Sequence, residues 1–293
     1  MNANSRPVLL SSFVAVAVLA VAAGYLLQAK AESVPVSDLH AQTHIHGLAV
    51  GRRDPGTLLI ATHHGLFRSG PDGEAELVSE VQDFMGFNAD PVDPERLYAS
   101  GHPAGGGNLG FIVSTDRGKT WEQVSPGLSG PVDFHQMTVS PADPRVIYGA
   151  YGALQVSRDA GKTWSVAGPL PDRLIDLAAS AGDARKLFAA TEGGLMVTRD
   201  SGATWEAIFA SAPVSMVEVA PDGRVYAFVL GRGLIGSADD PLDFEIVSGD
   251  WGERFLLHLA IDPSNPDRLF GATQDGAILA SADGGKTWKT FGE

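Results

Sequence analysis

The sequence predicts an all-β fold in which six repeated units close into one ring. An eight-residue signature recurs along the chain, and its intact copies place an Asp at positions 116, 159, 200 and 283, which are 43, 41 and 83 residues apart. Asp-Pro and similar turns recur between short apolar segments, and the 35 glycines follow no Gly-X-Y period. A composition of 44% hydrophobic residues excludes a disordered chain.

The signature itself predicts a turn that closes on its own side chains. Its Asp accepts backbone N–H groups, its Gly supplies a positive φ, and its Trp begins the next strand as an apolar plug. Degraded copies at 237–244 and 69–73 fill the missing periods and bring the number of repeats to six. The four intact copies are Ser114–Trp121, Ser157–Trp164, Thr198–Trp205 and Ser281–Trp288.

This signature resembles the Asp-box, or BNR, repeat of sialidases, other exo-acting glycosidases, sortilin-type receptors and photosystem assembly factors. The resemblance implies a β-propeller whose boxes lie at the outer edge, away from any ligand. Because receptors and enzymes share the repeat, it leaves function open.

Strand-like segments follow the recurring turns within each period, for example Leu58–Thr62, Arg96–Ser100 and Arg268–Gly271. Four short strands in about 42 residues make one propeller blade. We therefore predict a six-bladed β-propeller over residues 44–293, with 32–43 as a linker or as a strand added to the last blade.

The N-terminal residues 1–31 predict an export signal. Residues 8–27 are mostly apolar, Arg6 precedes them, and Ala29-Lys30-Ala31 suits cleavage before Glu32. Without cleavage, residues 8–27 are long enough to anchor the chain in the cytoplasmic membrane. Either outcome predicts a periplasmic or extracellular protein.

The net charge and the amino-acid composition argue against several classes of binding partner and of metal site. The net charge is −14, and without Arg6 and Lys30 the exported residues 32–293 carry 19 basic and 35 acidic groups, a net charge of −16. This balance disfavours nucleic acid and, apart from the N-terminal segment, the membrane. The absence of Cys excludes thiolate zinc sites and iron–sulfur clusters, leaving His, Met, Asp and Glu as metal ligands. We expect a monomer with no organic cofactor.

A column of metal-binding residue types is predicted at the channel mouth, at one position of the first strand in each blade. Imidazole with thioether suits copper, and imidazole with carboxylate suits zinc or copper(II). Core packing of the methionines and ordinary hydrogen bonding of the histidines remain the alternative. The column consists of His46, Met85, His135, Asp176, Met216 and His258.

Further polar residues map to the same face. Seven of the eight histidines, all but His40, fall on loops or strand starts that open there. The glycine-rich segment 101–108 predicts a flexible lid over the channel. The possible outer or lid ligands are His44, His63, His64 and His102, and Asp83 and Asp133 lie near the entrance.

Two other functions stay open. An exo-acting glycoside hydrolase would need two carboxylates, for which Asp83, Asp133, Asp176 and Glu192 are candidates, in the pairs 133 with 176 or 83 with 192. Sialidase activity itself is disfavoured because Thr43–His46 replaces the first-blade Arg of that pattern. The third possibility is a scaffold that binds a protein through this face.

Overall fold

The computed structural model describes residues 33–292. The predicted signal or anchor segment at residues 1–31 lies outside the described residues. No helix within residues 33–292 is both long and apolar enough to span a membrane.

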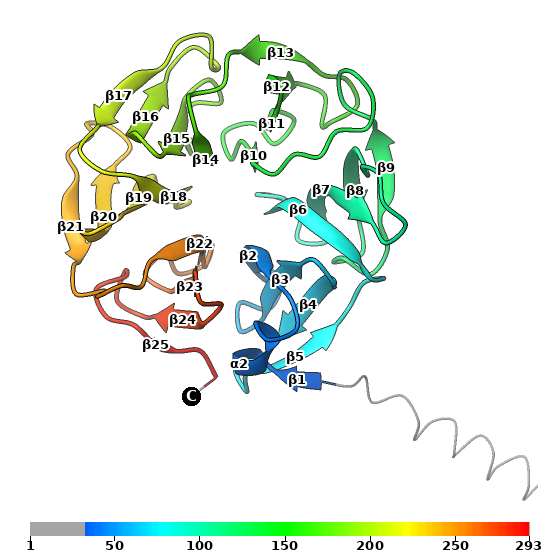
Figure 1. Cartoon of the computed structure of the whole chain (residues 1–293), viewed down its shortest axis with the longest axis horizontal. Coiled ribbons are helices and arrows are strands. Elements are labelled where there is room, and N and C mark those ends of the chain that lie inside the picture. The colour runs from blue at the N-terminus through cyan, green and yellow to red at the C-terminus, as the bar shows by residue number, and fades with distance from the viewer. Residues whose placement is uncertain (1–32, 293) are drawn as a thin grey trace, which may run out of the picture. The chain divides into compact units, whose positions relative to one another are not determined.

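The described chain forms six antiparallel sheets arranged as blades around a central axis (Figure 1). Each blade uses four consecutive strands, the first of which is the innermost, and one blade carries a fifth strand at its outer edge (Figure 1). The predicted all-β six-bladed propeller is therefore confirmed. Blade one contains β2 (Ile45–Val50), β3 (Leu58–Thr62), β4 (Gly65–Ser69) and β5 (Glu74–Leu77); blade two β6 (Gln82–Ala89), β7 (Leu97–Pro103), β8 (Phe111–Ser114) and β9 (Glu122–Ser125); blade three β10 (Met137–Val139), β11 (Ile147–Tyr151), β12 (Ala153–Ser157) and β13 (Ser165–Gly168); blade four β14 (Leu174–Ala179), β15 (Leu187–Thr191), β16 (Gly194–Thr198) and β17 (Glu206–Phe209); blade five β18 (Val214–Val219), β19 (Arg224–Val229), β20 (Gly233–Ala238) and β21 (Glu245–Ser248); blade six β22 (Leu256–Ile261), β23 (Leu269–Thr273), β24 (Ile278–Ser281) and β25 (Lys289–Thr290).

The segment predicted as a linker contributes to ring closure. Strand β1 (Ser33–Pro35) pairs with β5, so the added strand extends the first blade and not the last. The one-turn helix α2 (Val36–Leu39) follows, and its two apolar residues are buried in a cluster that contains side chains of blades one and six. The prediction missed this helix because a single turn is too short to show a helical period.

Apolar side chains pack between neighbouring blades. The interface of blades four and five, for example, buries Phe188, Val197, Val217 and Ala227. The alternation of inward and outward side chains in a strand presents one row to each neighbour, so every blade depends on the two beside it.

The Asp-box turns close within their own eight residues, as predicted. In the second intact copy, the Asp159 carboxylate accepts the Thr163 N–H (2.9 Å) and its hydroxyl (2.7 Å), while the Ser157 Oγ accepts the Gly161 N–H (2.8 Å). Both Ala160 (φ 61°) and Gly161 (φ 84°) adopt the left-handed conformation. The turn thus satisfies its polar groups locally, on the edge that we call the box face.

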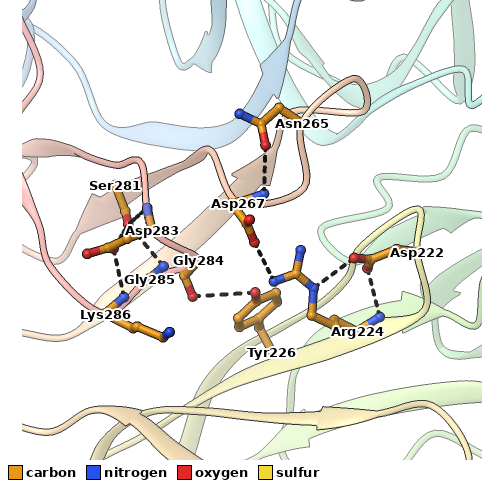
Figure 2. A network of polar contacts seen from close by, with 10 residues as sticks. All are labelled: Asp222, Arg224, Tyr226, Asn265, Asp267, Ser281, Asp283, Gly284, Gly285 and Lys286. Atoms are coloured by element: carbon orange, nitrogen blue, oxygen red, sulfur yellow. Dashed lines mark hydrogen bonds and ion pairs between the residues drawn. The ribbon is translucent and has the colours of Figure 1, made fainter.

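Side chains also link neighbouring blades on the box face (Figure 2). Arg224 contacts Asp222 of its own blade and Asp267 of blade six, each at 2.8 Å. The degraded box of blade five behaves differently, because its Asp239 pairs with Lys186 of blade four at 2.6 Å.

Candidate functional site

A first set of metal-binding groups lies at the channel mouth, where blades one and two meet. Asp83 of β6 lies between His46 of β2 and His63 of the loop after β3, with contacts of 3.0 Å and 2.9 Å to the two Nδ1 atoms. The His46 and His63 rings are 4.0 Å apart between centroids. Burial opposes ionisation of Asp83, but the two adjacent imidazoles outweigh it and lower the pKa of Asp83.

One pair of buried atoms in the first set is left without a hydrogen bond within the described chain. Although the His46 Nδ1 and Asp83 Oδ1 atoms are 3.0 Å apart, both are buried and neither has a hydrogen-bond partner among residues 33–292. The two atoms are therefore close without being aligned for a hydrogen bond.

A second set lies where blades two and three meet. Asp133, which precedes β10, places its Oδ2 at 3.0 Å from the His102 Nε2 and 2.6 Å from the His135 Nε2. Asp133 is only 8% exposed, and its buried Oδ1 has no hydrogen-bond partner within the described part of the chain. The Asp133 hydrogen bond raises the pKa of His135 against the effect of burial.

The loop after β7 orients His102. The His102 Nδ1 lies 2.7 Å from the Gly107 carbonyl oxygen, which can only accept a hydrogen bond. Nδ1 therefore carries the proton, and in the neutral ring Nε2 presents a lone pair toward Asp133. A backbone carbonyl that fixes the free ring nitrogen is typical of a metal-ligating histidine.

Each set offers three ligand atoms that lie within 4.8 Å of one another: His46, His63 and Asp83 in the first, and His102, Asp133 and His135 in the second. Each set combines side chains of two neighbouring blades. Two of the four histidines predicted as outer or lid ligands, His63 and His102, thus belong to the sets, and two of the four acids considered for catalysis, Asp83 and Asp133, are their carboxylates.

β-Bulges divide the predicted column into two. In β2 the pairing register shifts between Ile45 and Gly47, so His46 is the extra residue, whereas in β22 the shift leaves Leu257 as the extra residue. His46 and His258 therefore do not occupy equivalent positions. The corresponding extra residues of β14 and β18 are Ile175 and Ser215.

The remaining members of the column have other environments. The His258 Nε2 donates to the Ile45 carbonyl oxygen (3.1 Å), and burial lowers the pKa of His258 to about 4. Met216 is fully buried in an apolar cluster with Phe228 and Leu259. Met85 is half-buried and lines the channel cavity beside His46.

Asp176 lies inside this cavity with a second acid that the sequence analysis did not consider, Glu218. Asp176 accepts the backbone N–H groups of Leu177 (2.9 Å) and Val217 (3.0 Å). Desolvation raises the pKa of Asp176 to about 7, and desolvation together with the Asp176 charge raises the pKa of Glu218 to about 8. No sequence signal marked Glu218, because it lies two residues beyond the aligned column position.

The other predicted residues lie at the edge of the site. His44 stacks edge-on against His63 with centroids 5.6 Å apart, and the exposed His64 contacts the Gln42 carbonyl oxygen at 3.0 Å. Glu192 pairs with Arg173 on an exposed loop of blade four. The Glu192 carboxylate therefore belongs to neither set.

Comparisons with known proteins agree with the fold. A family model described as BNR/Asp-box repeat matches residues 112–123. Xyloglucanase Xgh74A of Acetivibrio thermocellus is 26% identical over 266 residues, which cover 70% of this chain and 32% of the relative. The chain thus spans about a third of the length of that curated relative.

The fold is also similar to that of several solved structures. The GH74 xyloglucanase of Xanthomonas campestris superposes with a TM-score of 0.57 at 18% identity, covering 85% of this chain and 45% of the enzyme. A structure of YCF48 bound to a D1 peptide gives a TM-score of 0.55 at 18% identity, covering 89% of this chain and 84% of that one. At these identities the structural likeness concerns the fold.

Proposed function

We propose that this Asp-box β-propeller is an exported protein that binds a transition metal, with copper favoured over zinc, through the His and Asp sets at its channel mouth. The observation that carries the proposal is Asp133. Its carboxylate is nine-tenths buried, its Oδ2 contacts two imidazole nitrogens, and its Oδ1 has no partner in the described residues. A buried carboxylate in this arrangement is costly unless a cation compensates it.

The tautomer of His102 supports a metal between the groups. If Nδ1–H donates to the Gly107 carbonyl, the neutral Nε2 cannot also donate to Asp133 at 3.0 Å. Two acceptor atoms that face each other need a proton or a metal ion between them. The metal content of the purified protein distinguishes these two cases.

The donor types favour copper(II). Two imidazoles with one carboxylate suit zinc or copper(II), and copper(II) is the tighter-binding divalent ion at a given nitrogen and oxygen site. The Met85 thioether beside the first set offers a softer donor as well. Zinc is the competing outcome.

The test uses residues 32–293 after removal of bound metal. The protein is titrated with Cu²⁺ or Zn²⁺ in a calorimeter, and electron paramagnetic resonance then shows whether nitrogen atoms coordinate the Cu²⁺. We expect stoichiometric copper with imidazole nitrogens in its coordination sphere. The doubly substituted His102→Ala, His135→Ala protein should lose the copper bound by the second set, whereas the control His64→Ala should retain the wild-type copper content. A folded wild-type protein that takes up neither ion overturns the proposal.

A glycoside hydrolase is the second candidate, and the identity with a xyloglucanase favours it. The acid pairs expected from the sequence have separate partners, since Asp133 contacts two histidines and Glu192 contacts Arg173. The raised pKa of Asp176 would suit a general acid. Release of reducing sugar from xyloglucan that Asp176→Asn abolishes would favour this candidate over the first.

A protein-binding role is the third candidate, favoured by the peptide-bound YCF48 structure. An assembly propeller would use the same mouth without metal. Co-purification of one defined protein with the metal-stripped chain, lost when lid residues 103–108 are deleted, would support it.

A further inference from the structure

The two sets of ligands are joined by one cross-strand pair. Asp83 of the first set and His102 of the second are directly opposed in the antiparallel ladder of β6 and β7. Opposed residues of such a ladder have Cα atoms about 4.5–5.5 Å apart and project their side chains from the same face of the sheet. Blade two therefore holds one ligand of each set side by side.

Blades two and three are also fixed closely at this point. Gly86 of β6 has a φ of 55°, and a Cβ built there would lie 2.3 Å from the Phe134 carbonyl oxygen. Only glycine allows this approach of the two backbones. Asp133 and His135 flank Phe134, so the contact holds the second set against the strand that carries Asp83.

A cavity of about 210 Å³ at the mouth opens beside both sets, because His46 of the first and His135 of the second line its wall. Gln136 and Asn88 add amide groups to the same wall. In the loop after β7, a Cβ at Gly105, Gly106 or Gly107 would meet nothing within 4 Å, so this part of the loop is open to solvent. A small molecule in this cavity could therefore contact one histidine of each set.

Coordination and charge indicate what such a molecule would be. Each set supplies three protein ligands, whereas zinc and copper(II) bind four or more, so each ion keeps an open position. Two divalent ions with the carboxylates of Asp83 and Asp133 leave a net charge of +2. A small anion with two oxygen donors would fill both open positions and reduce this charge.

We infer that the two sets form one two-ion centre, with the Asp83–His102 pair at its middle, that binds a small oxyanion across both ions. This inference rests on the metal binding proposed above, and it adds the class of ligand that the site accepts.

The test compares the wild-type protein with one variant for each set, His63→Ala and His135→Ala, and with His64→Ala as a matched control. Copper stoichiometry is measured by atomic absorption, coupling between ions by the half-field signal in electron paramagnetic resonance, and anion binding by calorimetric titration with inorganic phosphate. We expect the wild type and the control to bind two coupled ions and to bind phosphate. Each set variant should retain one uncoupled ion and bind phosphate at least tenfold more weakly.

The possible failures are separable. Two uncoupled ions, or phosphate affinity that is unchanged in the single-set variants or in metal-free wild type, would overturn the two-ion centre and leave the metal-binding proposal intact. Absence of bound metal in folded wild type would overturn the proposed function itself.

Discussion

Aspartate side chains have different hydrogen-bonding partners on the box face and at the channel mouth. On the box face, the Asp159 carboxylate accepts hydrogen bonds from Thr163, four residues further along the chain, and these bonds lie within a single turn. At the mouth, Asp133 meets histidines of two blades and keeps a buried oxygen unpartnered in the described structure. Polar groups that are hydrogen-bonded within one turn stabilise the fold. A buried polar cluster that keeps an atom without a hydrogen-bond partner indicates a site for a ligand.

The largest effect is expected from Asp133→Asn, because it removes the charge but keeps the shape of the side chain. Affinity of the second set for copper should fall by roughly 100-fold or more, given that even residues behind metal ligands cost 10–100-fold. Calorimetric titration measures this change. Asp159→Asn on the box face is the control, and an equal loss of copper there would remove the distinction between the faces.

Ser157→Ala on the box face should lower the stability of the fold without changing copper binding. The Ser157 hydroxyl accepts the buried Gly161 N–H at 2.8 Å, so its removal leaves that donor unsatisfied. The free energy of unfolding should fall by about 1–3 kcal/mol, with copper binding unchanged. Urea denaturation checks this, with the exposed Ser211→Ala as control; a Ser157 variant as stable as that control would contradict a stabilising role for the box.

The two regions should also respond to pH in opposite directions. Hydrogen bonds hold the pKa of Asp159, Asp200 and Asp283 at about 2, so the stability that these boxes supply is present above the pKa of the unfolded chain and lost as the pH falls from about 4 to 2.

In the channel, the stability is expected to change with pH in the opposite direction. The folded-state pKa values of Asp176 and Glu218, about 7 and about 8, exceed their unfolded values, so the unfolded state binds fewer protons and stability falls as the pH rises from about 4 to 8. Asp176→Asn and Glu218→Gln should each raise stability at pH 8 by about 1–3 kcal/mol and have little effect at pH 4. Melting temperatures across this range measure it, and parallel pH profiles of wild type and variants would refute the assignment.

The smallest effect is expected from Glu192→Gln. The Glu192 and Arg173 side chains are both more than half exposed, so their ion pair is screened by solvent. Melting temperature and copper affinity should both stay at the wild-type values. A loss of hydrolytic activity in this variant would instead return Glu192 to the catalytic role considered from the sequence.

The box turns could be predicted because each is a property of adjacent residues. Ser157, Asp159, Gly161 and Thr163 form their bonds within one turn, so residue order alone predicts their contacts. The sequence analysis placed His46 and His135 at the mouth of the channel, and both line the channel cavity in the structure; their role in binding a metal stays a prediction. The predicted equivalence of His46 and His258 was wrong by one residue, because the strand pairing makes Gly47 the counterpart of His258 and Leu257 the counterpart of His46.

The sequence by itself therefore determined the number of blades, their turns and the face that gathers the histidines, since these follow from periodicity and local bonding. The tertiary structure decided which side chains meet. It placed Asp83 and Asp133 between pairs of histidines, buried Met216 in the core and brought Glu218 next to Asp176. The physical reason is that these contacts join side chains of different blades, and the period of the repeat predicts where a strand recurs but not which side chain the neighbouring blade presents to it.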